Sequence, residues 1–61
     1  MNMKFYQKGR SEGYPVNSKQ DIIDSMGEFG YSIGSIEILE NGLVIGYIGE
    51  QGITLGYLRE N

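Results

Sequence analysis

The arrangement of the chain is decided by residues 40–60, which read ENGLVIGYIGEQGITLGYLRE. This segment contains two similar arms that follow each other at an offset of ten residues. Four positions are shared by the arms: Glu40 with Glu50, Gly42 with Gly52, Gly46 with Gly56, and Tyr47 with Tyr57. Ten residues fit one strand and one tight turn. Together with the residues before it, the repeat predicts a three-stranded antiparallel meander with strands over 31–40, 43–49 and 53–60.

The turn between the first two of these strands is predicted at Asn41–Gly42. Asn-Gly is the strongest short hairpin signal, because a type I′ turn needs positive φ at both central residues. This turn would place Glu40 opposite Leu43.

A second, weaker turn is predicted at Gln51–Gly52, either tight or widened to begin at Gly49. In the tight register each tyrosine of the repeat would cover a glycine on the other arm. The expected pairs are Gly46 with Tyr57 and Gly56 with Tyr47.

A helix is predicted over residues 18–29, ahead of the meander. Ser18 is a good N-cap, and Asp21 three positions later resembles the acidic partner of a capping box. The apolar stripe of this helix consists of Ile22, Met26 and Phe29, flanked by Ile23. We expect Gly30 to end it. A short first strand over 3–8 and a loop over 9–17 complete a single α+β domain, 1–61, of order β-α-β-β-β.

Both faces of the predicted meander carry large apolar side chains, whereas a sheet with one solvated face normally alternates apolar and polar residues. One face is expected to hold Ile36, Ile38, Leu43, Ile45, Tyr47 and Leu58. The other is expected to hold Leu39, Val44, Ile48, Ile53, Leu55 and Tyr57. One short helix covers one face, and the pattern does not say which. We take the second set as a candidate interface and expect the uncovered face to join two copies as a dimer.

The composition excludes most catalytic chemistry. The chain has no His and no Cys, which removes imidazole bases, thiol nucleophiles and the common zinc, haem and iron–sulfur ligands. We expect neither an enzyme nor a bound cofactor or metal. No apolar run approaches the roughly 20 residues of a membrane span. A soluble cytoplasmic protein is therefore predicted.

An alternative function rests on a basic and aromatic arm near the N-terminus, formed by Lys4, Phe5, Tyr6, Lys8 and Arg10. Cations interleaved with aromatic rings are typical of nucleic-acid contacts. The first ten residues carry +3, so the others carry −6 and the chain −3. This balance disfavours tight nucleic-acid binding.

The sequence thus predicts a small non-enzymatic module that acts by protein–protein contact and self-association, with a heterologous protein partner as a further possibility. In its small size and acidity the chain is similar to the small proteins that phages and mobile elements encode to block a host protein. That comparison rests on no motif.

Overall fold

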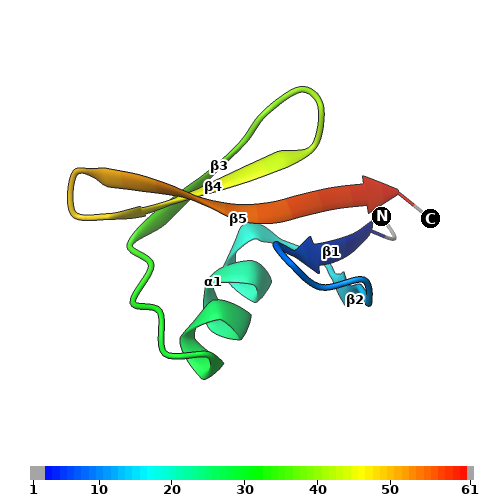
Figure 1. Ribbon diagram of the computed structural model, residues 1–61, viewed down its shortest axis with the longest axis horizontal. Helices are drawn as coiled ribbons and strands as arrows, with labels where there is room; N and C mark the ends of the chain where they lie inside the picture. Colours follow the sequence, from blue (N-terminus) through cyan, green and yellow to red (C-terminus); the bar gives the residue numbers. More distant parts are fainter. Residues whose placement is uncertain (1–2, 61) are drawn as a thin grey trace.

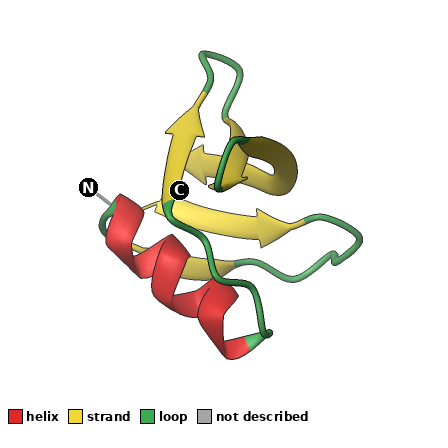
Figure 2. Cartoon of the chain, turned by 90° about the vertical axis from the view of Figure 1, so that its left-hand side faces the viewer, coloured by secondary structure: helices red, strands yellow, loops and turns green. Residues whose placement is uncertain are grey.

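The computed structural model describes residues 3–60, so the predicted domain limits at 1 and 61 lie outside it. The elements are β1 (Met3–Gln7), β2 (Tyr14–Val16), α1 (Lys19–Glu28), β3 (Ser35–Ile38), β4 (Leu43–Ile48) and β5 (Gln51–Glu60). The strands form one antiparallel sheet of order β2-β1-β5-β4-β3, with α1 against one side (Figures 1 and 2). The predicted α+β class and the C-terminal meander are confirmed.

Strand β2 lies in the segment that the sequence predicts as a loop. It pairs with β1, so that Tyr14 is opposite Phe5 and Val16 is opposite Met3. Pro15 has no N–H to donate, which suits a strand at the edge of a sheet. The Phe5 and Tyr14 rings meet edge to face, with centroids 5.6 Å apart. This aromatic contact helps to hold β2 in place although the strand is short.

Helix α1 begins where the capping signal predicts. The Ser18 hydroxyl accepts a hydrogen bond from Asp21 N–H, and the Asp21 carboxylate accepts one from Asn17 N–H at 2.7 Å. The helix ends at Glu28, and Gly30 adopts a φ of +92°. Phe29 is exposed. The apolar stripe therefore ends one turn earlier than predicted, because the chain leaves the helix before Phe29.

The β3–β4 turn differs from the predicted type I′ turn. Gly42 has a φ of +89°, but Asn41 does not have positive φ. Gly42 N–H donates to the Leu39 carbonyl, and Leu39 N–H donates to the Leu43 carbonyl at 2.8 Å. This is a three-residue loop with glycine at its last position, a common hairpin connection. The register moves by one residue, and Ile38 pairs with Val44.

The β4–β5 pairing also departs from the predicted register. Ile48 pairs with Gln51, so the turn is formed by Gly49 and Glu50. A bulge lies farther along, because Val44 pairs with Gly56 while Ile45 pairs with Thr54, which leaves Leu55 as the extra residue. A one-residue shift moves side chains to the opposite face. The predicted composition of the two faces is therefore wrong.

The glycine–tyrosine contact of the repeat exists with a different partner. Tyr47 lies opposite Gly52, and a Cβ added to Gly52 would be 3.0 Å from the Tyr47 ring. Gly56 instead faces β1, where an added Cβ would lie 2.0 Å from the Tyr6 carbonyl oxygen. One glycine makes room for a ring, and the other makes room for the backbone of a neighbouring strand.

The core lies between α1 and one side of the sheet. Its buried side chains come from every element and from the segment before β3: Phe5, Val16, Ile22, Met26, Ile33, Ile36, Val44, Leu55 and Leu58. Within residues 3–60, no helix has the length and apolar character needed to cross a membrane.

Within residues 3–60 no helix covers the other side of the sheet, which we call the open face. The strand registers assign to it Lys4, Tyr6, Glu37, Leu43, Ile45, Tyr47, Tyr57 and Arg59. It is mixed in character, with polar and charged groups among half-buried apolar side chains.

Candidate binding surfaces

The structure does not bring the six residues of the predicted interface together on one face. Val44 and Leu55 are buried in the core, and Ile53 packs against it. Leu39, Ile48 and Tyr57 are exposed, but they lie at the β3–β4 loop, at the β4–β5 turn and on the open face, respectively. The bulge at Leu55 separates Tyr57 from Ile53 because it reverses the alternation of β5, and the three-residue β3–β4 loop moves Leu39 away from the side that carries Val44.

The predicted basic and aromatic arm is divided in the same way. Phe5 is fully buried, whereas Lys4 and Tyr6 lie on the open face. Lys8 is exposed just after β1. The Arg10 guanidinium lies over the Phe29 ring, 5.0 Å from its centroid, and this cation–π contact turns it toward the end of α1.

Sequence reasoning assigned Tyr57 to the predicted interface, did not single out Arg59, and missed that both lie beside Lys4 and Tyr6. Tyr6 is directly opposite Tyr57 on β5, and Lys4 is directly opposite Arg59. We call these four residues the tyrosine–cation cluster. The signal in the sequence is the matching spacing, in which a cation and a tyrosine stand two positions apart on each strand. Their meeting depends on the register of β1 with β5, which joins the two ends of the described chain.

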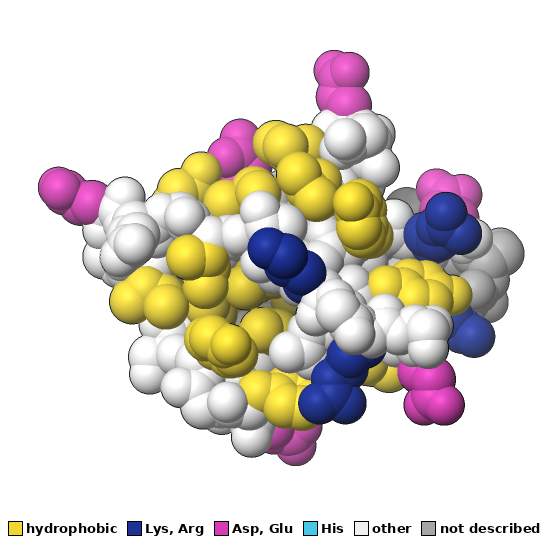
Figure 3. Space-filling model, viewed as in Figure 1, with side chains coloured by type: hydrophobic (Ala, Val, Ile, Leu, Met, Phe, Trp, Pro, Cys, Tyr) yellow, Lys and Arg dark blue, Asp and Glu magenta, His cyan; other side chains and the backbone are white. Residues whose placement is uncertain are grey.

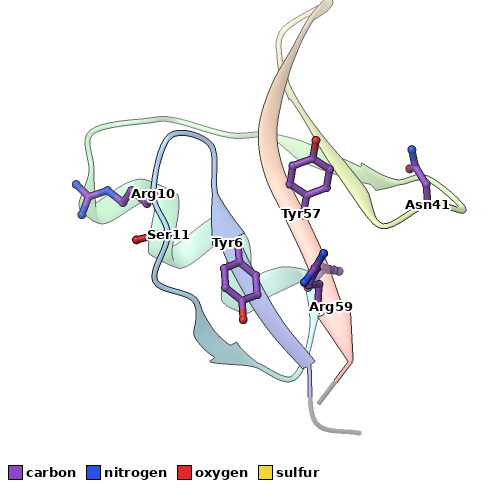
Figure 4. Close-up of a pocket in the computed structure, with 7 residues that line it drawn as sticks. Tyr6, Arg10, Ser11, Asn41, Tyr57 and Arg59 are labelled. Atoms are coloured by element: carbon purple, nitrogen blue, oxygen red, sulfur yellow. The ribbon is translucent and has the colours of Figure 1, made fainter.

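A trough of about 440 Å³ runs along three residues of the cluster, Tyr6, Tyr57 and Arg59, and Lys4 is not among its lining residues (Figure 4). It is lined by Tyr6, Arg10, Ser11, Asn41, Tyr57, Leu58 and Arg59, none of which is acidic. The Tyr6, Tyr57 and Arg59 side chains lie along it, while the Arg10 side chain points away. Tyr57 is 52% exposed and is the most accessible large apolar side chain described.

The loop before β2 fixes the position of Tyr6. A Cβ added to Gly13 would lie 2.8 Å from two atoms of the Tyr6 ring. Such a contact is closer than van der Waals packing allows, so the ring occupies space that only glycine leaves free at this position. Tyr6 is consequently half-buried, whereas its cross-strand neighbour Tyr57 is open to a ligand.

The acidic groups are divided between α1 and the surroundings of the trough, where Glu12, Glu40 and Glu60 are sequence neighbours of lining residues. Asp21, Asp24 and Glu28 belong to α1, which covers the opposite side of the sheet. Figure 3 shows acidic side chains around the rim of the molecule, whereas Lys and Arg side chains lie both near the middle of the view and at its right-hand rim, there beside an acidic side chain. Glu37 is the acid of the open face, and its carboxylate accepts a 2.8 Å hydrogen bond from the Tyr47 hydroxyl.

A second surface is the edge strand β3. The sheet has two edges, and the other is β2, which is three residues long with Pro15 at its centre. Leu39 N–H donates inward to β4. Because hydrogen bonding alternates along an antiparallel strand, the N–H and C=O groups of Ile36 and Ile38 point outward. The side chains of Ile38 and Leu39 are exposed beside this edge.

The remaining chemistry of the described residues is limited. In the range 3–60, no three His, Cys, Asp or Glu side chains lie close enough together to hold a metal ion. Comparison of the chain with protein-family models, with curated proteins and with solved structures found no match.

Proposed function

We propose that the protein is a small non-enzymatic interaction module that forms a two-fold dimer in the cytoplasm by pairing its β3 edges. The observation that carries this proposal is the outward row of unpaired backbone groups on β3. An exposed edge is a template for another strand, and proteins usually block it when it is not used. Pro15 blocks the β2 edge, whereas no proline stands in β3.

The side chains beside the edge support pairing with a second copy. Ile38 lines a groove of about 170 Å³, together with Met3, Val16, Asn17, Ser18, Lys19, Ile22 and Leu58. A second β3 strand would bring apolar side chains next to the mouth of this groove. Apolar surface that two copies cover reciprocally contributes twice in a two-fold dimer.

The register of the pair follows from charge. A two-fold axis at Glu37 would place two carboxylates directly opposite each other, which is unfavourable across a sheet. An axis at Ile38 would place two exposed isoleucines side by side instead. We therefore propose the register centred on Ile38, which would produce one continuous sheet across both subunits.

The test compares three variants by analytical ultracentrifugation, with circular dichroism as the check on folding. Ile38→Lys and Leu39→Lys should each convert the dimer to a folded monomer. Ile48→Lys is the matched control, because Ile48 is 42% exposed and Ile38 is 36% exposed, but Ile48 lies at the β4–β5 turn. This control should remain dimeric.

Two results would count against the proposal. A wild-type protein that stays monomeric at high micromolar concentration, with a concentration-independent melting temperature, would exclude the dimer. A dimer that survives both edge substitutions would use another surface.

A further inference from the structure

We infer that the tyrosine–cation cluster of the open face binds a single strand of nucleic acid, with one base stacked on Tyr57. This site is separate from the β3 edge, so it does not depend on the proposed dimer. The inference rests on four residues that the β1–β5 register brings together: Lys4, Tyr6, Tyr57 and Arg59.

The first argument is the placement of the two cations. Lys4 and Arg59 face each other directly across β1 and β5. Like charges in this position destabilise a sheet, while opposite charges stabilise it. An anion lying over both side chains would offset their repulsion. A phosphate group meets this requirement, because Arg and Lys are the side chains that most often contact nucleic-acid phosphates.

The second argument is the accessibility of the rings. Tyr57 is 52% exposed although it lies in the middle of three strands, between Tyr6 and Leu43. A base has a flat apolar face that stacks on such a ring irrespective of sequence, and aromatic residues on a sheet face beside cations are a common platform for single strands. A duplex keeps its bases stacked inside and cannot use Tyr57 in this way.

The third argument is the shape and charge of the surroundings. The trough runs from Ser11 in the β1–β2 loop past the cluster to Asn41 in the β3–β4 loop, and no acidic side chain lines it. Ser11 and Asn41 add neutral polar groups at its two ends. Three of the eight acidic residues of the chain lie on α1, behind the sheet, while Glu12, Glu40 and Glu60 are sequence neighbours of the lining residues Ser11, Asn41 and Arg59.

An acidic protein segment is the competing occupant, because it would also satisfy Lys4 and Arg59. A run of carboxylates, however, offers no flat apolar face to the exposed Tyr57 ring. The observations therefore favour nucleic acid, and the experiment is designed to separate the two.

The experiment measures fluorescence anisotropy of labelled oligodeoxythymidylate and oligouridylate titrated with the wild-type protein. We expect binding at low salt. The logarithm of the association constant should fall with the logarithm of the salt concentration with a slope of about −1.4, because Lys4 and Arg59 would neutralise two phosphates and each phosphate of a single strand contributes about −0.7. A duplex of the same length and an oligoglutamate peptide serve as competitors. Both should compete weakly.

Matched substitutions assign the site. Tyr57→Leu should weaken binding about tenfold or more through loss of stacking. The control Tyr31→Leu should have no effect, because Tyr31 is comparably exposed but lies beyond α1. Lys4→Gln and Arg59→Gln should each reduce the salt slope by about 0.7. Lys19→Gln makes the same change in net charge at the start of α1 and should leave the slope unchanged.

Three outcomes would overturn the inference. One is the absence of any binding to either oligonucleotide at low salt by a protein that is folded by circular dichroism. Another is equal weakening by the cluster variants and their controls, which would indicate nonspecific attraction. The third is competition by oligoglutamate as strong as that by the unlabelled oligonucleotide, which would assign the face to acidic protein segments.

Discussion

Tyr47 donates a 2.8 Å hydrogen bond from its hydroxyl to Oε1 of Glu37, on the adjacent strand β3. The two residues are diagonal neighbours, since Glu37 pairs with Ile45 and Ser35 pairs with Tyr47. The bond joins an edge strand to its neighbour on the open face. It also holds the one open-face carboxylate against a hydroxyl.

This contact predicts a late titration of Tyr47. The hydrogen bond to Glu37, followed by the charge of Glu37 and then by partial desolvation, raises the pKa of Tyr47 above its ordinary value of 10.0. Ultraviolet titration of the tyrosinate band should show one of the five tyrosines ionising late. Glu37→Gln should lower that pKa, and Tyr47→Phe should remove the late step. Identical curves for wild type and Glu37→Gln would contradict the assignment.

The same contact predicts the direction of a stability change with pH. A group whose pKa is raised by folding stabilises the folded state below its unfolded pKa, and this stabilisation is lost as pH rises through the folded pKa. The Tyr47 contribution should therefore be constant below about pH 10 and decline above it. Chemical denaturation across this range should show a smaller decline for Tyr47→Phe than for wild type.

Gly56 should be the glycine least tolerant of substitution. A Cβ there would lie 2.0 Å from the Tyr6 carbonyl oxygen, so Gly56→Ala should separate β1 from β5 and cost about 3 kcal/mol or more. Gly27→Ala is the control, because it should raise the free energy of unfolding where Gly56→Ala lowers it. Gly27 lies in α1 with nothing within 4 Å of an added Cβ, and alanine should stabilise the helix by up to about 1 kcal/mol. Urea denaturation measures both. Equal changes in the free energy of unfolding for the two variants would contradict the close approach of Gly56 to the backbone of Tyr6.

The β3–β4 loop predicts unequal effects at its two signal residues. Gly42→Ala should be the more harmful, because Gly42 combines a φ of +89° with an added Cβ 2.5 Å from the Leu58 carbonyl oxygen. Asn41→Ala loses only an exposed 3.1 Å hydrogen bond from Leu43 N–H to the Asn41 side chain, about 1 kcal/mol or less. Thermal melts that rank the two variants in the reverse order would contradict this loop geometry.

Replacing Tyr14 with Phe is expected to leave the stability of the fold intact. Its hydroxyl is buried without a hydrogen-bond partner, while its ring packs against Phe5. Tyr14→Phe keeps the ring and removes the unpaired polar group, so the free energy of unfolding should stay the same or rise by about 1 kcal/mol. A loss of stability in urea denaturation would mean that the hydroxyl has a partner in solution.

The sequence predicted the elements whose signals are local. The capping pair at Ser18 and Asp21 located the helix, and the repeat located the three strands of the meander. The strand registers could not be predicted. The bulge adds one residue at Leu55, and the β3–β4 loop that ends at Gly42 is one residue longer than predicted. Each change reverses which side chains face the core, and neither has a local signature in the sequence. Strand β2 was missed because Pro15 is unfavourable in a strand except at an edge, and edges are defined only by the completed sheet.

The candidate surfaces depended on this same long-range information. Lys4 and Tyr6 were identified from their local pattern, but their partners Tyr57 and Arg59 lie at the far end of the sequence. Phe5, between them, reads as part of the same arm and is in fact the most deeply buried residue of β1, because strand alternation sends it to the other face.

The position of β5 between β1 and β4 has a consequence for folding during translation. The chain makes two local hairpins, β1–β2 and β3–β4, and neither touches the other within the sheet. Only β5, which follows the other described elements in the chain, bridges them. We expect a nascent chain to hold no complete sheet until β5 has left the ribosome, and the domain then to fold in a single cooperative step.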